Sequence, residues 1–196
     1  MAKPLPWLVP AVWTAGVIPA AAVALRAAQD ELGANPISEA LNRFGLTALV
    51  FLVASLACTP LQWVTHWTWP VRIRRALGIL GFSYATLHFL VYLVLDQQLA
   101  VGEVLEDVGK RPFITVGFTA WLLLIPLAVT STTGAVKRLG FVRWKKLHRL
   151  AYLCAALGVV HFYWRVKKDH TEPLIYAAVV AFLLMVRVVR SAQTRK

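Results

Sequence analysis

The sequence has few charged side chains for its length. Asp, Glu, Lys and Arg make up 15% of its 196 residues, against roughly a quarter in ordinary soluble domains. Hydrophobic residues make up 59%, and the mean hydropathy is +0.63. A soluble fold of this length needs a polar coat that this composition cannot supply. A water-soluble domain is therefore excluded, and lipid is the expected solvent.

Acidic residues are the scarcer charge. Nine Asp and Glu stand against 21 Lys and Arg, which gives a formal net charge of +12. A basic chain invites a nucleic-acid interpretation, but these charges cluster in short segments between apolar runs, as in loops at a membrane surface. We therefore expect no nucleic-acid partner, and a basic face that suits the anionic head groups of a lipid bilayer or an acidic partner.

Common catalytic and metal-binding motifs are missing as well. The only cysteines, Cys58 and Cys154, lie inside apolar runs without CxxC or metal-type spacing, so we expect two buried thiols. The chain holds no GxGxxG, P-loop, HExxH or nucleophile-elbow sequence. No acidic residue lies deep in an apolar run, which argues against a proton relay built on carboxylates.

Long apolar segments dominate what is present. The first resembles a signal peptide only superficially, because its n-region holds a single lysine and prolines interrupt it, so we expect a retained membrane helix. We predict an all-α polytopic membrane bundle of about six helices, forming one domain over residues 1–196. The segments lie near 7–25, 43–63, 76–95, 113–130, 147–165 and 173–190.

The charges segregate between the two sets of connecting loops. The termini and two alternate loops hold 14 of the 21 basic residues, at positions 3, 72–75, 137–149 and 187–196. The other side holds all nine acidic residues. Since basic residues concentrate on the cytoplasmic side of membrane proteins, we predict that both termini are cytoplasmic.

Three of the five histidines lie in or beside apolar segments, whereas His66 and His170 fall in expected loops. His88 lies about 18 Å from the inner end of its helix, and His161 about 21 Å, at 1.5 Å per residue. Two imidazoles at matching depth on different helices can fill both axial positions of a haem iron, an arrangement that suits electron transfer. Tyr84 and Tyr92, at i±4 from His88, could pack on or bond such a porphyrin.

His148 is harder to interpret. It lies 13 residues before His161, so the two side chains point about 140° apart around a regular helix. It could ligate a second haem, contact a flavin or quinol, or cap a basic surface. The nearby stretch Thr130-Ser131-Thr-Thr-Gly134, followed by two cations, could cradle a phosphate or be a polar loop leaving the membrane.

Several strings, in matching order from about residue 30 to 190, carry a family resemblance. They resemble the MsrQ family, once called YedZ, the haem-binding membrane subunits of bacterial periplasmic methionine-sulfoxide reductase systems. That family belongs to the ferric-reductase-like transmembrane group of b-type cytochromes. The strings are Leu32-Gly-Ala-Asn-Pro-Ile37, Thr59-Pro-Leu61, Arg74-Arg-Ala-Leu-Gly78, Lys110-Arg-Pro-Phe-Ile-Thr-Val-Gly117, Thr130-Ser131 with Gly134, and Trp144-Lys-Lys-Leu-His-Arg-Leu-Ala-Tyr152.

The resemblance implies a function that composition could not give. It implies a multi-pass protein of the bacterial inner membrane with haem b and FMN as cofactors. Electrons would enter from a cytoplasmic flavin reductase or the quinol pool. They would leave to MsrP, a periplasmic molybdopterin enzyme that reduces methionine sulfoxide during repair of oxidised proteins. The chain would be the electron-transfer subunit, and the matching metal ligands are His88, His148 and His161.

One departure from the wider group concerns the number of haems. Its two-haem members carry a second histidine on the third helix, but Arg75 and Arg74 stand 13 and 14 residues before His88 here. We therefore expect one haem between His88 and His161, and a second would need an unusual ligand opposite His148. We count Arg74 and Arg75 among the candidate cofactor-binding residues, together with Thr130, Ser131 and Gly134.

Two other functions stay open at this point. The first is a stand-alone ferric-reductase-like cytochrome that hands electrons to a small acceptor. Such proteins usually carry a fused flavin and nicotinamide domain, which these residues do not include. The second is a transporter or scaffold whose histidines hold no cofactor, and that protein would be colourless.

Overall fold

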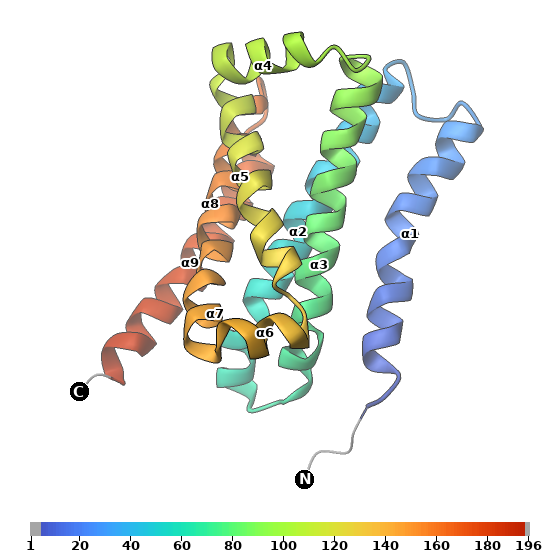
Figure 1. The fold of residues 1–196 in the computed structure, drawn as a ribbon. Coiled ribbons are helices and arrows are strands. Elements are labelled where there is room, and N and C mark those ends of the chain that lie inside the picture. The colour runs from blue at the N-terminus through green and yellow to red at the C-terminus, as the bar shows by residue number, and fades with distance from the viewer. Residues whose placement is uncertain (1–4, 195–196) are drawn as a thin grey trace.

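The computed structural model describes residues 5–194 and is helical throughout, with no strand in that range. It confirms the predicted all-α polytopic bundle (Figure 1). The elements are α1 (Leu8–Ala28), α2 (Pro36–Thr65), α3 (Trp69–Leu90), the π-helix η1 (Val91–Asp96), α4 (Val101–Lys110), α5 (Pro112–Val129), α6 (Thr133–Leu139), α7 (Phe141–Leu147), α8 (Leu150–Arg165) and α9 (Thr171–Gln193).

Five helices are long and apolar enough to cross a membrane: α1, α2, α3 continued by η1, α5 and α9. Their outward faces carry large exposed apolar side chains, for example Ile18 at 63% and Phe182 at 60% exposure. Such faces suit lipid rather than water. The chain is therefore a multi-pass membrane protein, and Cys58 and Cys154 are buried within it, as expected.

The predicted fifth segment, residues 147–165, differs from the structure. The chain turns at His148 and Arg149, and α8 begins only at Leu150 and spans 16 residues. At 1.5 Å per residue α8 is about 24 Å long, short of the about 30 Å of hydrocarbon. His148 therefore ends α7 instead of opening the helix that carries His161.

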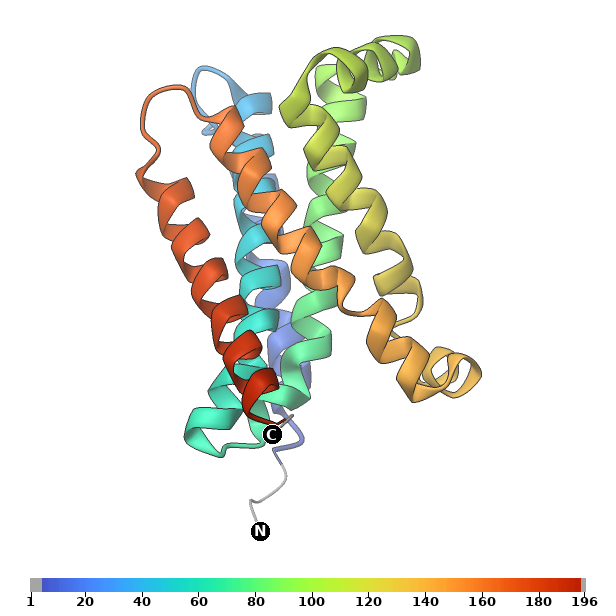
Figure 2. The ribbon, with the colours of Figure 1, turned by 90° about the vertical axis from the view of Figure 1, so that its left-hand side faces the viewer.

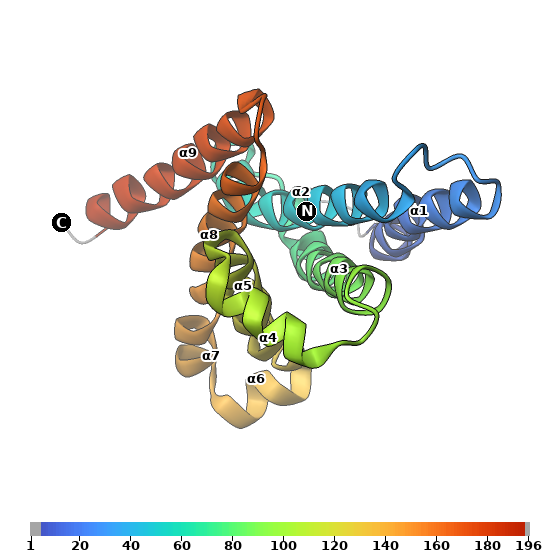
Figure 3. The same cartoon turned by 90° about the horizontal axis from the view of Figure 1, so that it is seen from above.

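The helices pack around α2. It contacts α1, α3, α8 and α9, while α5 pairs with α8 and also touches α3. Seen from above, α1 and α9 lie on opposite sides of the bundle, with α3, α5 and α8 between them (Figure 3). One buried cluster joins α1, α2 and α3, and a second joins α2, α8 and α9.

Local sequence explains several helix ends. Asn35 caps α2 by accepting a hydrogen bond from the Ser38 amide at 3.0 Å, and Pro36 occupies the first turn. Pro112 starts α5 in the same way. His66 ends α2 in the left-handed conformation, and His170 immediately precedes α9, so both lie between helices as predicted.

The short helices lie at opposite ends of the bundle. α4 crosses the end at which α3 finishes and α5 begins, whereas α6 and α7 lie at the other end (Figures 1 and 2). α1 starts and α9 finishes at the α6–α7 end. The basic loops and the acidic loops are thus at opposite ends, as the charge pattern predicted.

Candidate cofactor site

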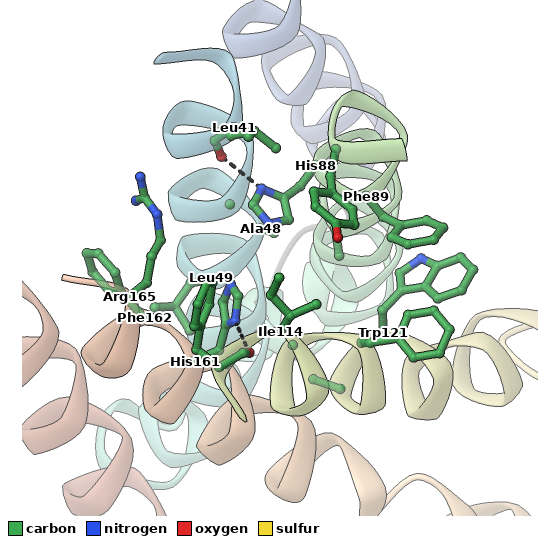
Figure 4. A pocket seen from close by; sticks show the side chains of 18 of the residues that line it. Leu41, Ala48, Leu49, His88, Phe89, Ile114, Trp121, His161, Phe162 and Arg165 are labelled. Atoms are coloured by element: carbon green, nitrogen blue, oxygen red, sulfur yellow. Dashed lines mark hydrogen bonds between the residues drawn. The ribbon is translucent and has the colours of Figure 1, made fainter. Parts of the chain in front are cut away.

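A cavity of about 490 Å³ lies between α2, α3, α5 and α8, toward the end covered by α4. Its wall is mostly apolar, including Leu46, Leu49, Phe89, Trp121 and Leu124 (Figure 4). Phe89 stacks on Trp121 with ring centres 4.5 Å apart. The volume falls in the range of roughly 300–1,000 Å³ that is usual for ligand sites.

His88 from α3 and His161 from α8 both lie in this cavity (Figure 4). Their ring centres are 6.0 Å apart, and the rings are nearly perpendicular at 81°. With metal–nitrogen bonds of about 2 Å, two imidazoles on opposite sides of one metal ion have ring centres roughly 6 Å apart. The structure thus brings together the two histidines whose depths matched, at a spacing that fits one shared metal ion.

Each histidine is anchored by its Nδ1 to a backbone carbonyl. Nδ1 of His88 lies 2.8 Å from the Leu41 oxygen, and Nδ1 of His161 lies 2.7 Å from the Phe113 oxygen. A carbonyl oxygen can only accept, so each Nδ1 carries the proton and each Nε2 keeps a lone pair. This is the tautomer in which imidazole binds a metal through Nε2.

Tyr84 and Tyr92, the two tyrosines at i±4 from His88, have different surroundings. Tyr92 lines the cavity and donates a hydrogen bond to Asp107 of α4 at 3.0 Å. Tyr84 is buried against α1 and is not among the cavity residues. Its hydroxyl donates to the Gly16 oxygen at 2.7 Å and accepts from the Ala20 amide at 2.9 Å. Tyr84 therefore joins two helices and is removed from the candidate cofactor site.

Polar groups gather at the α4 end of the cavity. Arg165, one turn after His161, is half-buried, and its side chain forms no ion pair or hydrogen bond with residues 5–194. Arg111 is more exposed and pairs with Asp107 at 3.1 Å. The Asn42 side-chain oxygen is buried without a partner in the same range. This end of the cavity therefore offers a free cation and an unsatisfied amide to a polar ligand group.

A second polar cluster lies at the opposite end of the bundle, around His148. The imidazole stacks on Trp144 with ring centres 4.1 Å apart, and its Nε2 lies 3.0 Å from the Thr130 hydroxyl. Trp144 donates to the Thr130 carbonyl at 3.0 Å. Burial first, and then the charge of Arg74, lower the pKa of His148 from its ordinary value. His148 therefore faces the Thr130 hydroxyl and the Trp144 ring, and within residues 5–194 no second histidine contacts it.

The other residues predicted near His148 lie farther from this cluster or make different contacts. Arg74 donates to the Thr59 hydroxyl at 3.0 Å, while Arg75 is exposed. Ser131 donates to the Leu127 carbonyl at 2.7 Å. Gly134 lies in the first turn of α6 with open space around it. Thr130 thus belongs to the His148 cluster, and Arg74 acts on His148 through its charge. Within residues 5–194 no hydrogen bond joins the side chain of Ser131 or Arg75 to His148.

Comparison with known proteins places this architecture in a family. A family model described as "Ferric reductase like transmembrane component" matches residues 40–159. A Deinococcus radiodurans protein named "Protein-methionine-sulfoxide reductase heme-binding subunit MsrQ" is 48% identical over 98% of this chain and 95% of its own length. The chain belongs to the MsrQ family.

Further MsrQ proteins with the same printed name support the assignment. The protein of Herminiimonas arsenicoxydans is 49% identical over 94% of this chain and 85% of its own length. That of Rhodospirillum rubrum is 47% identical over 95% of this chain and 89% of its own length. No solved structure matches this chain. The MsrQ assignment confirms the family expected from the sequence strings.

Sequence reasoning missed several cavity groups. Arg165 lies four residues after His161, so the i, i+4 rule that selected the tyrosines could have found it. No sequence pattern selected Asn42, because a single amide side chain near the start of a helix is common. The Leu41 and Phe113 carbonyls could not be found, because a backbone oxygen has no residue-type signature.

Proposed function

We propose that this chain is the transmembrane electron-transfer subunit of a methionine-sulfoxide reductase and holds haem b between His88 and His161. The observation that carries the proposal is the pair of imidazoles, 6.0 Å apart in an apolar cavity, with both Nδ1 atoms bonded to carbonyls. The names of the related MsrQ proteins, which state haem binding, support the same cofactor.

The residues present fit a haem better than a bare metal ion. Residues 5–194 contain no group of three or more His, Cys, Asp or Glu that could hold a metal ion. Two imidazoles alone leave most of a metal's coordination positions empty, and a macrocycle supplies the missing ligands. The apolar wall of the cavity suits the faces of a porphyrin.

The bound haem would supply one-electron reduction and oxidation at the iron. The protein's residues do the rest. His88 and His161 would hold the haem iron, and ligation by two imidazoles favours electron transfer. Leu49, Phe89 and Trp121 line the cavity with apolar surface and would keep water from the bound haem. Arg165 would bind a carboxylate of the haem, because it is the half-buried cation that lines the cavity without an acidic partner.

We further propose that electrons enter at the α6–α7 end, from a cytoplasmic flavin reductase or from quinol. The basic charge of this end is typical of a cytoplasmic face in the bacterial inner membrane. His148, Thr130 and Trp144 form an ordered aromatic and polar cluster there. FMN or a quinol head group would contact this cluster. The acidic α4 end would face a periplasmic MsrP-like molybdoenzyme that reduces methionine sulfoxide.

The test is a reduced-minus-oxidised visible spectrum of the purified detergent-solubilised protein, with haem quantified per chain. We expect sharp low-spin b-type bands at one haem per chain. Two haems per chain would make His148 a ligand. A folded preparation from haem-replete cells that carries no haem would overturn the proposal.

Electron delivery is tested separately by mixing the reduced protein with a purified MsrP-like partner and following reoxidation. Fast reoxidation by the partner together with methionine sulfoxide supports the subunit role. Equally fast reoxidation by ferric chelates alone would instead indicate a stand-alone ferric-reductase-like cytochrome.

A further inference from the structure

Each of the two cavity histidines packs against a glycine of the neighbouring helix. A Cβ atom at Gly45 of α2 would lie 3.1 Å from Nδ1 of His88. A Cβ atom at Gly117 of α5 would lie 2.6 Å from Nδ1 of His161. Distances under about 3.0 Å do not occur for real Cβ atoms. An alanine at Gly117 would therefore have to displace the ring of His161.

In both halves of the site, the glycine lies one helical turn after the residue whose carbonyl accepts the histidine's hydrogen bond. His88 bonds the Leu41 oxygen, four residues before Gly45, and His161 bonds the Phe113 oxygen, four residues before Gly117. In an α-helix the Cα–Cβ bond points back toward the N-terminus. A side chain at either glycine position would therefore lie over the carbonyl that the imidazole must reach.

We infer that Gly45 and Gly117 are positioning residues that open a helical carbonyl to each haem-ligating histidine and so fix both rings with Nε2 toward the iron. The inference rests on the proposed haem ligation. It makes the site two equivalent halves: α2 with α3, and α5 with α8. The histidine follows its carbonyl by 47 residues in one half and by 48 in the other.

Gly117 lies closer to its histidine than Gly45 does. An alanine should therefore perturb the α5–α8 half more than the α2–α3 half. The Nδ1–H bond to a carbonyl orients a metal-bound imidazole and raises its basicity, and loss of such a partner typically costs about 10–100-fold in metal affinity. We expect Gly117→Ala to bind haem at least about tenfold more weakly. Gly45→Ala needs a shift of only a few tenths of an ångström. It should keep its haem but show a changed low-spin signal.

Two glycines of this chain serve as matched controls. A Cβ atom at Gly16 of α1 would lie 2.5 Å from Leu80, so Gly16→Ala introduces the same overlap between two membrane helices, away from the cavity. Gly109 of α4 has open space around it, so Gly109→Ala tests only the general effect of alanine in a helix. Neither control touches a histidine.

The experiment titrates haem into each detergent-solubilised apo-variant and records the electron paramagnetic resonance spectrum and the midpoint potential of the ferric low-spin centre. We expect the largest g value and the potential to change in Gly117→Ala and, less, in Gly45→Ala, with a positive shift in potential because a less basic imidazole stabilises ferric iron less. Gly16→Ala and Gly109→Ala should match the wild type.

Three outcomes separate the possibilities. If wild-type protein binds haem and both cavity variants keep its g value and potential, the inference is overturned and the proposed function stands. Equal changes in Gly16→Ala and Gly117→Ala would also overturn it, because helix packing alone would explain them. Wild-type protein without haem overturns the proposed function. If Gly117→Ala fails to fold, the spectrum of Gly45→Ala decides alone.

Discussion

The imidazoles of His88 and His161 meet nearly edge to face, with ring centres 6.0 Å apart, although 73 positions separate them in the chain. Both rings are held by backbone carbonyls of the helices next to their own. Neither Nε2 atom is bonded to a protein group in the part of the chain that the structure describes. Both Nε2 atoms are therefore available to a ligand in the cavity that the two rings line.

Replacing either histidine by alanine should remove this ligand site. We expect His88→Ala and His161→Ala each to lower haem content by more than about tenfold, because loss of a direct ligand costs more than loss of its outer partner. Haem extracted from purified protein measures the effect. His66→Ala, at the end of α2, is the control and should keep its haem. Full haem retention in both cavity variants would rule out the pair as ligands.

Arg165 should tune the reduction potential. A half-buried positive charge beside the site stabilises the reduced, less positive state of the cofactor. We expect Arg165→Gln to lower the midpoint potential by some tens of millivolts, since about 1.4 kcal/mol corresponds to about 59 mV for one electron. Arg165→Lys keeps the charge and should shift the potential less. Arg111→Gln should also have a smaller effect, because Arg111 already pairs with Asp107. An unchanged potential in Arg165→Gln would contradict this role.

His148 should affect electron entry and leave the main haem in place. We expect His148→Ala to slow reduction by the donor about tenfold or more, while the haem content stays near that of the wild type. Stopped-flow reduction by a quinol and by a reduced flavin, measured in parallel, identifies which donor depends on the residue. Thr130→Val removes the hydrogen-bond partner of Nε2 and should show part of the effect. A halved haem content in His148→Ala would instead identify a second haem.

Tyr84 should contribute to stability and not to the cofactor spectrum. Its hydroxyl bridges the Gly16 oxygen and the Ala20 amide of α1, two groups four residues apart that a regular helix pairs with each other. We expect Tyr84→Phe to cost about 1–3 kcal/mol, the usual penalty for buried polar groups left without a partner. A lower melting temperature with an unchanged visible spectrum would confirm this. Tyr92→Phe, which lines the cavity, is the contrasting variant and should alter the spectrum.

The charge pattern predicts the direction of the bundle in the membrane. Reporter fusions within α4 should give a periplasmic signal, and fusions between α6 and α7 a cytoplasmic one, because the basic end is retained inside. A cytoplasmic signal from α4 would invert the proposed path of electrons. The same fusions at Gln193, the last residue of α9, should agree with those at α6–α7, since both lie at one end of the bundle.

The sequence by itself determined the class of the protein and predicted the two histidines of the proposed haem site. Apolar runs of about 20 residues can be satisfied only by helices in lipid, so composition predicts the bundle. The constant rise of a helix then converts residue counts into depth, which matched His88 with His161. The short sequence strings that resemble the MsrQ family determined the assignment, because they match that family in the same order along most of the chain.

The tertiary structure decided what depends on contacts between helices. The break at His148 and Arg149 delays the start of α8 to Leu150 and leaves His148 beside Thr130, which helical periodicity cannot foresee. Tyr84 lies four residues before His88, on the same face of α3 by helical spacing, yet its side chain contacts α1. The packing of neighbouring helices, and not spacing alone, decides which side chains reach the cavity. The carbonyls of Leu41 and Phe113 became anchors only when packing brought them to the histidines. Backbone oxygens are the same in every residue, so only the folded arrangement distinguishes these two.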